Sequence, residues 1–245
     1  MAARANPAPD EPRLARVAAQ IADPSRARML AYLLSGEYAS AGELARAASV
    51  TPATASGHLV RLLDAGFVAC EPRGRHRYYR LADGEIAHAL EALALVAERS
   101  SHERAWSSPQ RLRLRHARCC YGHLAGTMGV NLLDSMLRSG WLQPGLSGLA
   151  LSAAGAAWLD QIGLDGQAWH AQANGAAAQR MAYACLDWSE RRDHLAGRLA
   201  RALLEHFIAR RWLVRREGER ALELTRAGGI ALQSIIAPRA SSIGT

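Results

Sequence analysis

Residues 51–80 read TPATASGHLVRLLDAGFVACEPRGRHRYYR, and the spacing of the apolar side chains changes within this stretch. Up to Leu63 the apolar residues recur every three or four positions, which is typical of an amphipathic helix. After Gly66 the segments FVACEP and RYYRLA have the composition of strands, and the basic turn RGRH around Gly74 joins them. The stretch therefore predicts a helix followed by a β-hairpin.

The residues before this stretch predict three further helices. PRLARVAAQIA and RARMLAYLLSG have helical spacing, and Asp23 and Ser25 around Pro24 are candidate caps between them. Ser40 and Glu43 have the spacing of a capping box, which predicts a short third helix. After the hairpin, DGEIAHALEALALVAER predicts an amphipathic helix to about residue 99. Two short helices with a tight turn, followed by a hairpin, indicate a winged helix-turn-helix.

The helix after Thr51 has the face that a DNA-reading helix needs. Thr54, Gly57, His58 and Arg61 lie opposite its apolar stripe, so small residues and hydrogen-bond donors would face the bases. Residues 46–80 hold six arginines against two acids, and most of the arginines flank the predicted hairpin tip. DNA binding is the expectation. The alternative is a winged helix that only holds structure or binds protein.

The segment also resembles the ArsR family of bacterial transcriptional regulators. The resemblance is carried by DPSR, ELA, T-x-x-x-x-S-x-HL, LLDAGFV and G-R-x-R-Y-Y-R-L, and it covers roughly residues 12–100. It implies a homodimer, joined through the first helix and the helix after the wing, that binds an imperfect palindrome of double-stranded DNA. The DNA-binding residues that these two arguments indicate are Thr51, Pro52, Thr54, Ser56, Gly57, His58, Arg61, Arg73, Arg75 and Arg77.

The usual metal sites of that family are not expected here. Its metal-sensing members often carry a cysteine pair in the third helix, where this chain reads GELARAAS. Others use acidic residues and histidines on the helix after the wing, and the spacing of His88 and His102 does not fit that set. Any signal is therefore expected to enter through the second half of the chain.

The composition limits the classes of protein to consider. The chain has 245 residues, a net charge of +8 and four cysteines, and it has no apolar run of the roughly 18 residues that span a membrane. We expect a cytoplasmic protein without a membrane partner, with free thiols and no disulfide framework. The motifs of common enzyme classes, such as a phosphate loop or H-E-x-x-H, are missing, so an enzyme is not expected.

The second half contains an internal repeat. HLAGTMGVNLLDSMLRSGWL begins at His123 and HLAGRLARALLEHFIARRWL begins at His194. Past a variable turn, LALSAAGAAWL matches LELTRAGGIAL. Each copy predicts a helix, a strand from the Trp-Leu pair, a turn, a second strand and a helix start, which is also the order around the wing. One predicted turn, QPGLSG, is neutral, and the other, RREGER, mixes arginines with acids, so extra DNA reading by this half is not favoured.

The expected fold is mainly α with small β-hairpins. It comprises a winged helix-turn-helix domain and a C-terminal domain of duplicated winged-helix-like helix–hairpin units packed as a pseudo-twofold pair. The expected limits are a disordered tail at 1–11, a DNA-binding and dimerisation domain at 12–100, a linker at 101–112, an effector-sensing domain at 113–237 and a tail at 238–245.

The segments RHARCCYGHLAG and ACLDWSERRDHLAG, just ahead of the two copies, carry the candidate effector site. The whole second half resembles an extended ArsR-type subgroup with these motifs, but the resemblance supplies no ligand. One hypothesis is a repressor released by a small organic effector, for which the candidate residues are Cys120, His123, Cys185, Trp188, Arg191 and His194.

Two alternatives stay open at this site. Cys120, His123, Cys185 and His194 could bind a soft metal ion, or the thiols, Cys119 included, could sense oxidants. In the metal hypothesis Cys120 and His123, three apart, would lie on one helical face, and adjacent Cys119 would point elsewhere. A purely structural domain, with the tryptophans in its core, is the other alternative.

Overall fold

The computed structural model describes residues 12–73, 76–99, 108–145, 148–173, 180–216 and 219–236. The chain divides into two compact units, Met1–Ala87 and His88–Thr245. The division falls within a single helix, α5 (Gly84–Arg99), and α6 (Pro109–His116) begins inside the expected linker. The domain limits expected from the sequence therefore stay a prediction, and both expected tails lie outside the described residues. No helix of the described part is long and apolar enough to cross a membrane.

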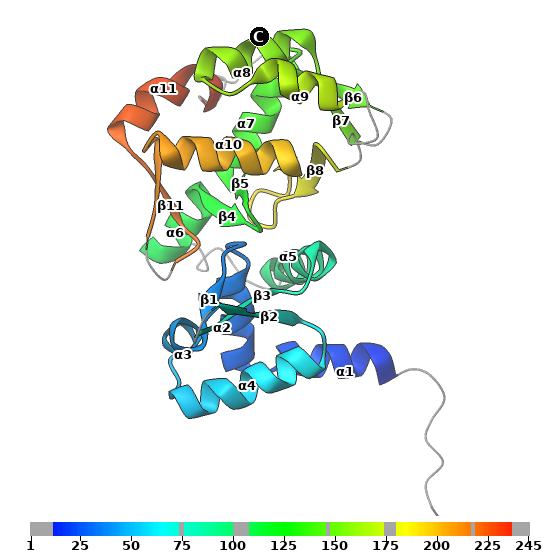
Figure 1. Ribbon diagram of the computed structural model, residues 1–245, viewed down its shortest axis with the longest axis vertical. Coiled ribbons are helices and arrows are strands. Elements are labelled where there is room, and N and C mark those ends of the chain that lie inside the picture. Colours follow the sequence, from blue (N-terminus) through cyan, green and yellow to red (C-terminus); the bar gives the residue numbers. More distant parts are fainter. Residues whose placement is uncertain are drawn as a thin grey trace, which may run out of the picture. The chain divides into compact units, whose positions relative to one another are not determined.

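The first unit packs helices against a small sheet (Figure 1). Its described elements are α1 (Pro12–Ile21), α2 (Pro24–Leu33), β1 (Ala39–Ser40), α3 (Ala41–Ala48), α4 (Pro52–Asp64), β2 (Val68–Arg73), β3 (His76–Leu81) and the start of α5. The strand order is β1-β3-β2, and all pairs are antiparallel. Sequence reasoning predicted the β2–β3 hairpin but missed β1, whose two residues are too few to show alternation.

The helix starts of this unit follow the predicted caps. The Asp23 carboxylate accepts hydrogen bonds from the backbone N–H groups of Ser25 and Arg26, at 3.0 and 2.9 Å. Ser40 and Glu43 form the predicted capping box, and Thr51 caps α4 ahead of Pro52. These side chains satisfy donors that the first turn of a helix leaves without partners, so the helix-turn-helix boundaries are encoded locally.

The second unit is a chain of hairpins and helices. Its described elements after α5 are α6, β4 (Arg118–Cys120), β5 (His123–Ala125), α7 (Thr127–Arg138), β6 (Leu142–Gly145), β7 (Gly148–Leu151), α8 (Ala153–Ile162), α9 (Gly166–Ala173), β8 (Tyr183–Leu186), β9 (Asp193–Ala196), α10 (Arg198–Ala209), β10 (Leu213–Arg215), β11 (Leu222–Leu224) and α11 (Arg226–Ile236). The order hairpin, helix, hairpin, helix thus occurs twice, with α9 between the two runs.

The HLAG phrase corrects one expectation. We expected it to open a helix, but in each copy its first three residues form the second strand of a hairpin, β5 or β9. The following glycines, Gly126 and Gly197, have φ of 80° and 98°, and α7 and α10 begin directly after them. A Cβ on either glycine would come within 2.6 Å or less of a backbone oxygen. The glycine is therefore required where strand turns into helix.

The two runs contact each other through matching hydrogen bonds. The Leu222 N–H, in the second hairpin of the second run, donates to the Ala117 carbonyl beside β4 at 2.9 Å. The Leu149 N–H, in the second hairpin of the first run, donates to the Ala182 carbonyl beside β8 at 2.8 Å. Helices α7 and α10 supply Leu133 and Phe207 to one continuous apolar core shared by both runs.

Candidate functional site

Most of the predicted recognition residues lie on one exposed side of α4. Thr51, Pro52, Thr54, Ser56 and Gly57 are exposed, whereas Ala55, Leu59 and Leu62 are buried in the first unit. Space around Gly57 is open, since a Cβ built there would meet no atom within 4 Å. This face has the small polar character that close approach to base edges needs.

His58 and Arg61 have different surroundings. The His58 side chain is only 14% exposed, and its Nδ1 lies 3.9 Å from the Asp23 carboxylate at the start of α2. His58 thus lies near a helix cap and is less exposed than Thr54, and its expected DNA contact stays a prediction. Arg61 is exposed and lines a groove of about 560 Å³ together with Arg16 and Val17 of α1.

The wing strands carry arginines of two kinds. Arg80 binds the Glu71 carboxylate at 3.1 Å and two backbone carbonyls, so it stabilises the hairpin base. Arg73 lies 4.2 Å from the centre of the Tyr38 ring, and Arg77 is exposed. Arg75, which was predicted to contact DNA together with Arg73 and Arg77, lies outside the described residues.

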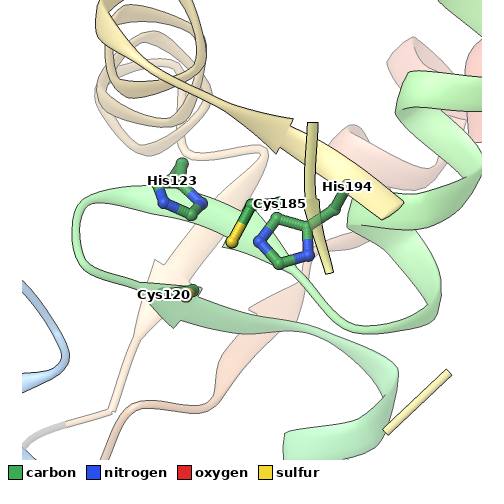
Figure 2. A group of neighbouring side chains, drawn as sticks. All are labelled: Cys120, His123, Cys185 and His194. Atoms are coloured by element: carbon green, nitrogen blue, oxygen red, sulfur yellow. The ribbon is translucent and has the colours of Figure 1, made fainter. Parts of the chain in front are cut away.

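The second unit gathers four of the predicted effector residues in one place. The ligand atoms of Cys120, His123, Cys185 and His194 all lie within 4.8 Å of one another, and all four residues are buried (Figure 2). We call this group the Cys/His tetrad. The two imidazole rings have centroids 5.1 Å apart.

Equivalent positions of the two hairpins build the tetrad. Cys120 faces His123 across β4–β5, and Cys185 faces His194 across β8–β9, each as a paired position in the register. The expected helical face for Cys120 and His123 is therefore wrong. A two-residue turn joins them, with φ of 48° at Tyr121 and 94° at Gly122, and turns with two positive φ values suit tight hairpins.

The surroundings shift the pKa values of the four tetrad residues in different directions. The hydrogen bond between the two thiols, with burial, raises the pKa of Cys120, whereas the same bond and the neighbouring His194 lower the pKa of Cys185. Burial, followed by the charge of His194, holds the pKa of His123 well below its usual range. Burial also opposes protonation of His194, but Asp187 and Cys185 outweigh it and raise its pKa to about 9. The lowered pKa favours the neutral form of His123, in which one ring nitrogen carries a lone pair that can bind a ligand.

Asp187 supports the tetrad from the loop between β8 and β9. Its Oδ2 lies 3.2 Å from His194 Nδ1 and accepts a hydrogen bond from the Gly126 N–H at 2.7 Å. Its Oδ1 accepts from the Ser189 hydroxyl at 2.7 Å and lies 3.0 Å from Arg118 Nη2. Burial would raise the pKa of Asp187, but the contacts with His194 and Arg118 hold it far below the usual range.

Two of the predicted effector residues are not brought to the tetrad. The Trp188 ring lies against the Arg118 guanidinium, 4.5 Å from centroid to carbon, which is a cation–π contact within the protein. Arg191 is exposed on the loop, with φ of 54°. As expected, Cys119 does not join its neighbour, since its side chain packs in the apolar core. Other tryptophans also pack there, such as Trp158 stacked on Trp141.

Sequence reasoning missed three charged residues beside the tetrad. Arg118 is fully buried, Glu91 of α5 is nearly so, and Arg220 donates a hydrogen bond to Glu91 at 2.6 Å. The pKa of Glu91 is lowered, because its two arginines outweigh the effect of burial. Arg118 stands beside the quoted cysteines and could have been singled out there. Glu91 and Arg220 are far apart in sequence and gave no signal.

Comparison with known proteins extends over both units. A helix-turn-helix domain family matches residues 21–71. YdfF of Bacillus subtilis (strain 168), an uncharacterised HTH-type transcriptional regulator, is 38% identical over 224 residues, which are 91% of this chain and 96% of YdfF. The HTH-type transcriptional regulator CmtR of Mycobacterium tuberculosis is 40% identical over 86 residues, 35% of this chain and 72% of CmtR.

Two solved structures resemble the first unit in sequence. The cadmium metal-sensor CmtR of M. tuberculosis is 37% identical, covers 34% of this chain and 85% of its own, and has a TM-score of 0.30. A homodimeric winged helix-turn-helix DNA-binding domain from Mycobacterium bovis, described as a possible ArsR-family regulator, is 25% identical, covers 42% and 94%, and has a TM-score of 0.34. The likeness to YdfF, which spans nearly the whole of both proteins, decides the assignment. The chain belongs to the HTH-type transcriptional regulators, and its first unit is a winged helix-turn-helix.

Proposed function

We propose that this regulator is a homodimeric repressor that binds an imperfect palindrome of double-stranded DNA, and that a soft divalent metal ion bound by the Cys/His tetrad releases it. The DNA contacts would come from the exposed face of α4 and the wing, as the sequence predicted. The proposed ligand is a metal ion of the zinc or cadmium type, whereas the first hypothesis from the sequence was an organic effector.

One observation carries the metal assignment. Two thiols and two imidazoles converge in a buried position, and the buried Nδ1 of His123 has no hydrogen-bond partner among the described residues. Two cysteines and two histidines are a common ligand set for zinc, and a tetrahedral ion would hold the ligand atoms roughly 3.4–3.8 Å apart. From their present separations within 4.8 Å, the four atoms need to move by only about 1 Å to reach that geometry.

The surroundings favour a metal ion over an organic effector. Trp188 and Arg191 were candidates for binding an organic effector, but Trp188 packs against Arg118 and Arg191 is exposed. The atoms at the centre of the site are thiol sulfurs and imidazole nitrogens, which are the ligands of zinc-type metal ions. CmtR, which is similar over the first unit, is described as a cadmium sensor, and this supports metal sensing as a class without supplying the ligands.

The matching contacts of the two runs support the predicted duplication. Ala117 and Cys120 in the first run correspond to Ala182 and Cys185 in the second. Leu222 of the second run donates to Ala117 of the first, and Leu149 of the first run donates to Ala182 of the second. A self-complementary interface of this kind follows from a twofold axis. The tetrad would then be a site made by symmetry, with one Cys-His pair from each copy.

The DNA part is tested by substitution on the two expected elements. Thr54→Ala and Arg77→Ala should each weaken binding of the full-length protein to DNA from its own promoter region, measured by fluorescence anisotropy. Loss of a base contact costs about 1–3 kcal/mol, or roughly 5- to 150-fold in affinity. Arg80→Ala is a poor probe because it disturbs the hairpin base. Arg210→Ala, an exposed change in the second unit, is the control. Unchanged binding by both test variants would contradict the DNA surface.

The metal part is tested with cobalt and zinc. Titration of the full-length protein with Co²⁺ should give one ion per chain with thiolate-to-cobalt charge-transfer absorption, and Zn²⁺ should displace it. Cys120→Ser and Cys185→Ser should lower the affinity by more than the 10- to 100-fold typical of changes outside the ligand set. Cys70→Ser and Cys119→Ser are the matched controls. Equal affinity in Cys120→Ser and wild type would rule the tetrad out.

Release from DNA completes the test. Zn²⁺ should weaken promoter binding by the wild type and leave Cys185→Ser unaffected. If wild type releases DNA only with a co-purified organic molecule found by native mass spectrometry, the organic-effector hypothesis holds instead.

The proximity of the thiols also favours a second candidate, oxidant sensing. Peroxide could oxidise Cys120 and Cys185 to a disulfide, with loss of both thiol protons and reduction of one peroxide to two waters. Peroxide would then release DNA in the absence of metal, and prior loading with Zn²⁺ would protect the thiols. Release of DNA by Zn²⁺ alone, under reducing conditions, would support metal sensing over oxidant sensing.

A further inference from the structure

A row of buried charged groups leads away from the Cys/His tetrad. It starts at His194, whose Nδ1 lies 3.2 Å from Asp187, and continues from Asp187 to Arg118 at 3.0 Å. Arg118 Nη2 lies 3.7 Å from Glu91 Oε2, and the other oxygen of Glu91 binds Arg220 at 2.6 Å. The row therefore ends on α5, the helix that carries Glu91.

Burial makes the members of this row dependent on one another. Arg118 and Asp187 have no solvent exposure, and Glu91 is 4% exposed. A charge withdrawn from water is tolerated only when it is paired, so each group is held by its neighbours. An ion bound by the tetrad would draw the ligand atom of His194 towards the other three ligand atoms. Asp187, 3.2 Å from His194 Nδ1, would then shift with His194 at the expense of its contact with Arg118.

The position of Glu91 connects the row, along the chain, to the first unit. Helix α5 begins at Gly84, shortly after the wing strand β3 ends at Leu81. The residues of α5 up to Ala87 belong to the first unit, and those from His88 belong to the second. Glu91 thus stands on the one helix that both units share along the chain, one turn beyond the division.

We propose that metal occupancy of the tetrad is transmitted through Asp187 and Arg118 to Glu91, and so to α5 and the DNA-binding unit. This inference rests on the proposed metal-sensing function and names its route. Asp187 acts as a positioning residue for the ligand His194, in the way that carboxylates outside a metal site orient its histidines. Glu91 is a positioning residue of another kind, since it couples the site to α5 without helping to bind the ion.

Two substitutions in the full-length protein test the two ends of the row separately. Asp187→Asn should lower Zn²⁺ affinity about 10- to 100-fold, as removal of such a partner does. Glu91→Gln should change Zn²⁺ affinity by less than about threefold, but it should bring the ratio of DNA affinities without and with Zn²⁺ from its wild-type value to near 1. Glu91→Asp, which keeps the carboxylate, should restore part of that ratio.

The control is a carboxylate in the same unit outside the row. Glu219 pairs with Arg113 at 3.3 Å in a partly exposed position, and Glu219→Gln should leave both Zn²⁺ affinity and the DNA ratio as in wild type. Circular dichroism and thermal melting confirm that each variant folds. If Glu91→Gln folds, binds Zn²⁺ and keeps the wild-type ratio, the route is wrong.

A second measurement does not depend on DNA. In wild type, Zn²⁺ should change amide hydrogen exchange in residues 88–97 of α5 as well as around the tetrad. In Glu91→Gln the change around the tetrad should persist and the change in α5 should vanish. A wild type in which Zn²⁺ affects the tetrad region but not α5 overturns the route. A wild type that binds Zn²⁺ with no effect on DNA overturns the proposed function itself, so the two failures are distinguishable.

Discussion

The two cysteine-bearing hairpins of the second unit share a frame, meaning the register of their strands and the glycine that follows, and they differ in their turns. Both present a Cys-His pair at the same register, and a glycine with positive φ follows each. β4–β5 closes with Tyr121 and Gly122, whereas six residues, 187–192, join β8 to β9. The longer loop supplies Asp187 to His194, and His123 has no such carboxylate within the part of the chain that the structure describes.

In the proposed metal site, this difference would separate two roles. Equivalent positions of the two hairpins would supply the ligands, as the proposed duplication predicts. The longer loop would supply the groups outside the ligand set, which contact one histidine and pair with Arg118. The two hairpins would thus contribute equally to the ligands and unequally to the groups around them.

The largest effect is expected where the loop meets the first hairpin. Arg118→Leu leaves Asp187 and Glu91 buried without one of their cations, and breaking a buried pair in this way costs about 3–5 kcal/mol. Urea denaturation of the purified protein measures the loss in the unfolding free energy. Glu219→Gln, which breaks a half-exposed pair, should cost less than about 1 kcal/mol. Similar losses for the two variants would refute the central place given to Arg118.

The next effect tests the frame that the hairpins share. Gly126→Ala and Gly197→Ala should each destabilise the protein by about 2–3 kcal/mol, because both glycines have conformations that residues with a Cβ avoid. The new Cβ would lie 2.4 Å from the Arg115 carbonyl oxygen or 2.6 Å from that of Met181. Gly229→Ala, within α11 and with open space around it, should stabilise by up to about 1 kcal/mol. A large cost at Gly126 with none at Gly197 would break the equivalence of the hairpins.

The repeat was visible in the sequence because its glycines and tryptophans recur in order. The Cys/His tetrad and the charged groups beside it were only partly predictable from the sequence. Cys120, His123, Cys185 and His194 could be named because the two copies align. The β4–β5 and β8–β9 hairpins could not, since three or four residues show no alternation. The row to Glu91 depends on packing between α5, β4 and the segment before β11, which no local pattern encodes.

The first unit was more accessible to prediction than the second. Its helix starts depend on Asp23, Ser40 and Thr51, which act within three residues of themselves. The contact of His58 with Asp23 was not predicted, for the opposite reason. The helical position of His58 suited the DNA face, but the contact with Asp23 comes from the packing of α4 against α2.

A moderate effect is expected inside the loop. Ser189→Ala removes a hydroxyl that donates to Asp187 at 2.7 Å and accepts from Arg118 at 3.0 Å. The stability should fall by about 1–2 kcal/mol, since a partly buried hydrogen-bond network loses one member. Ser152→Ala, which removes a helix cap on α8 away from the loop, gives a comparison of about 1 kcal/mol. Only the loop variant should also weaken Co²⁺ binding, because Ser189, unlike Ser152, donates a hydrogen bond to the carboxylate behind His194.

The smallest effect distinguishes the two turns themselves. Tyr121 precedes Gly122 with φ of 48°, and asparagine is favoured over tyrosine at that position of a two-residue hairpin turn. Tyr121→Asn should therefore stabilise by a few tenths of a kcal/mol, roughly 0.2–0.5, after loss of the distant ring contact with Arg201. Arg191→Asn, at φ of 54° in the long loop, should give a similar gain without that loss. Neither change touches the ligands, so Co²⁺ affinity should stay constant in both. A fall in affinity for Tyr121→Asn alone would mean that the short turn, and not only the loop, sets the position of its Cys-His pair.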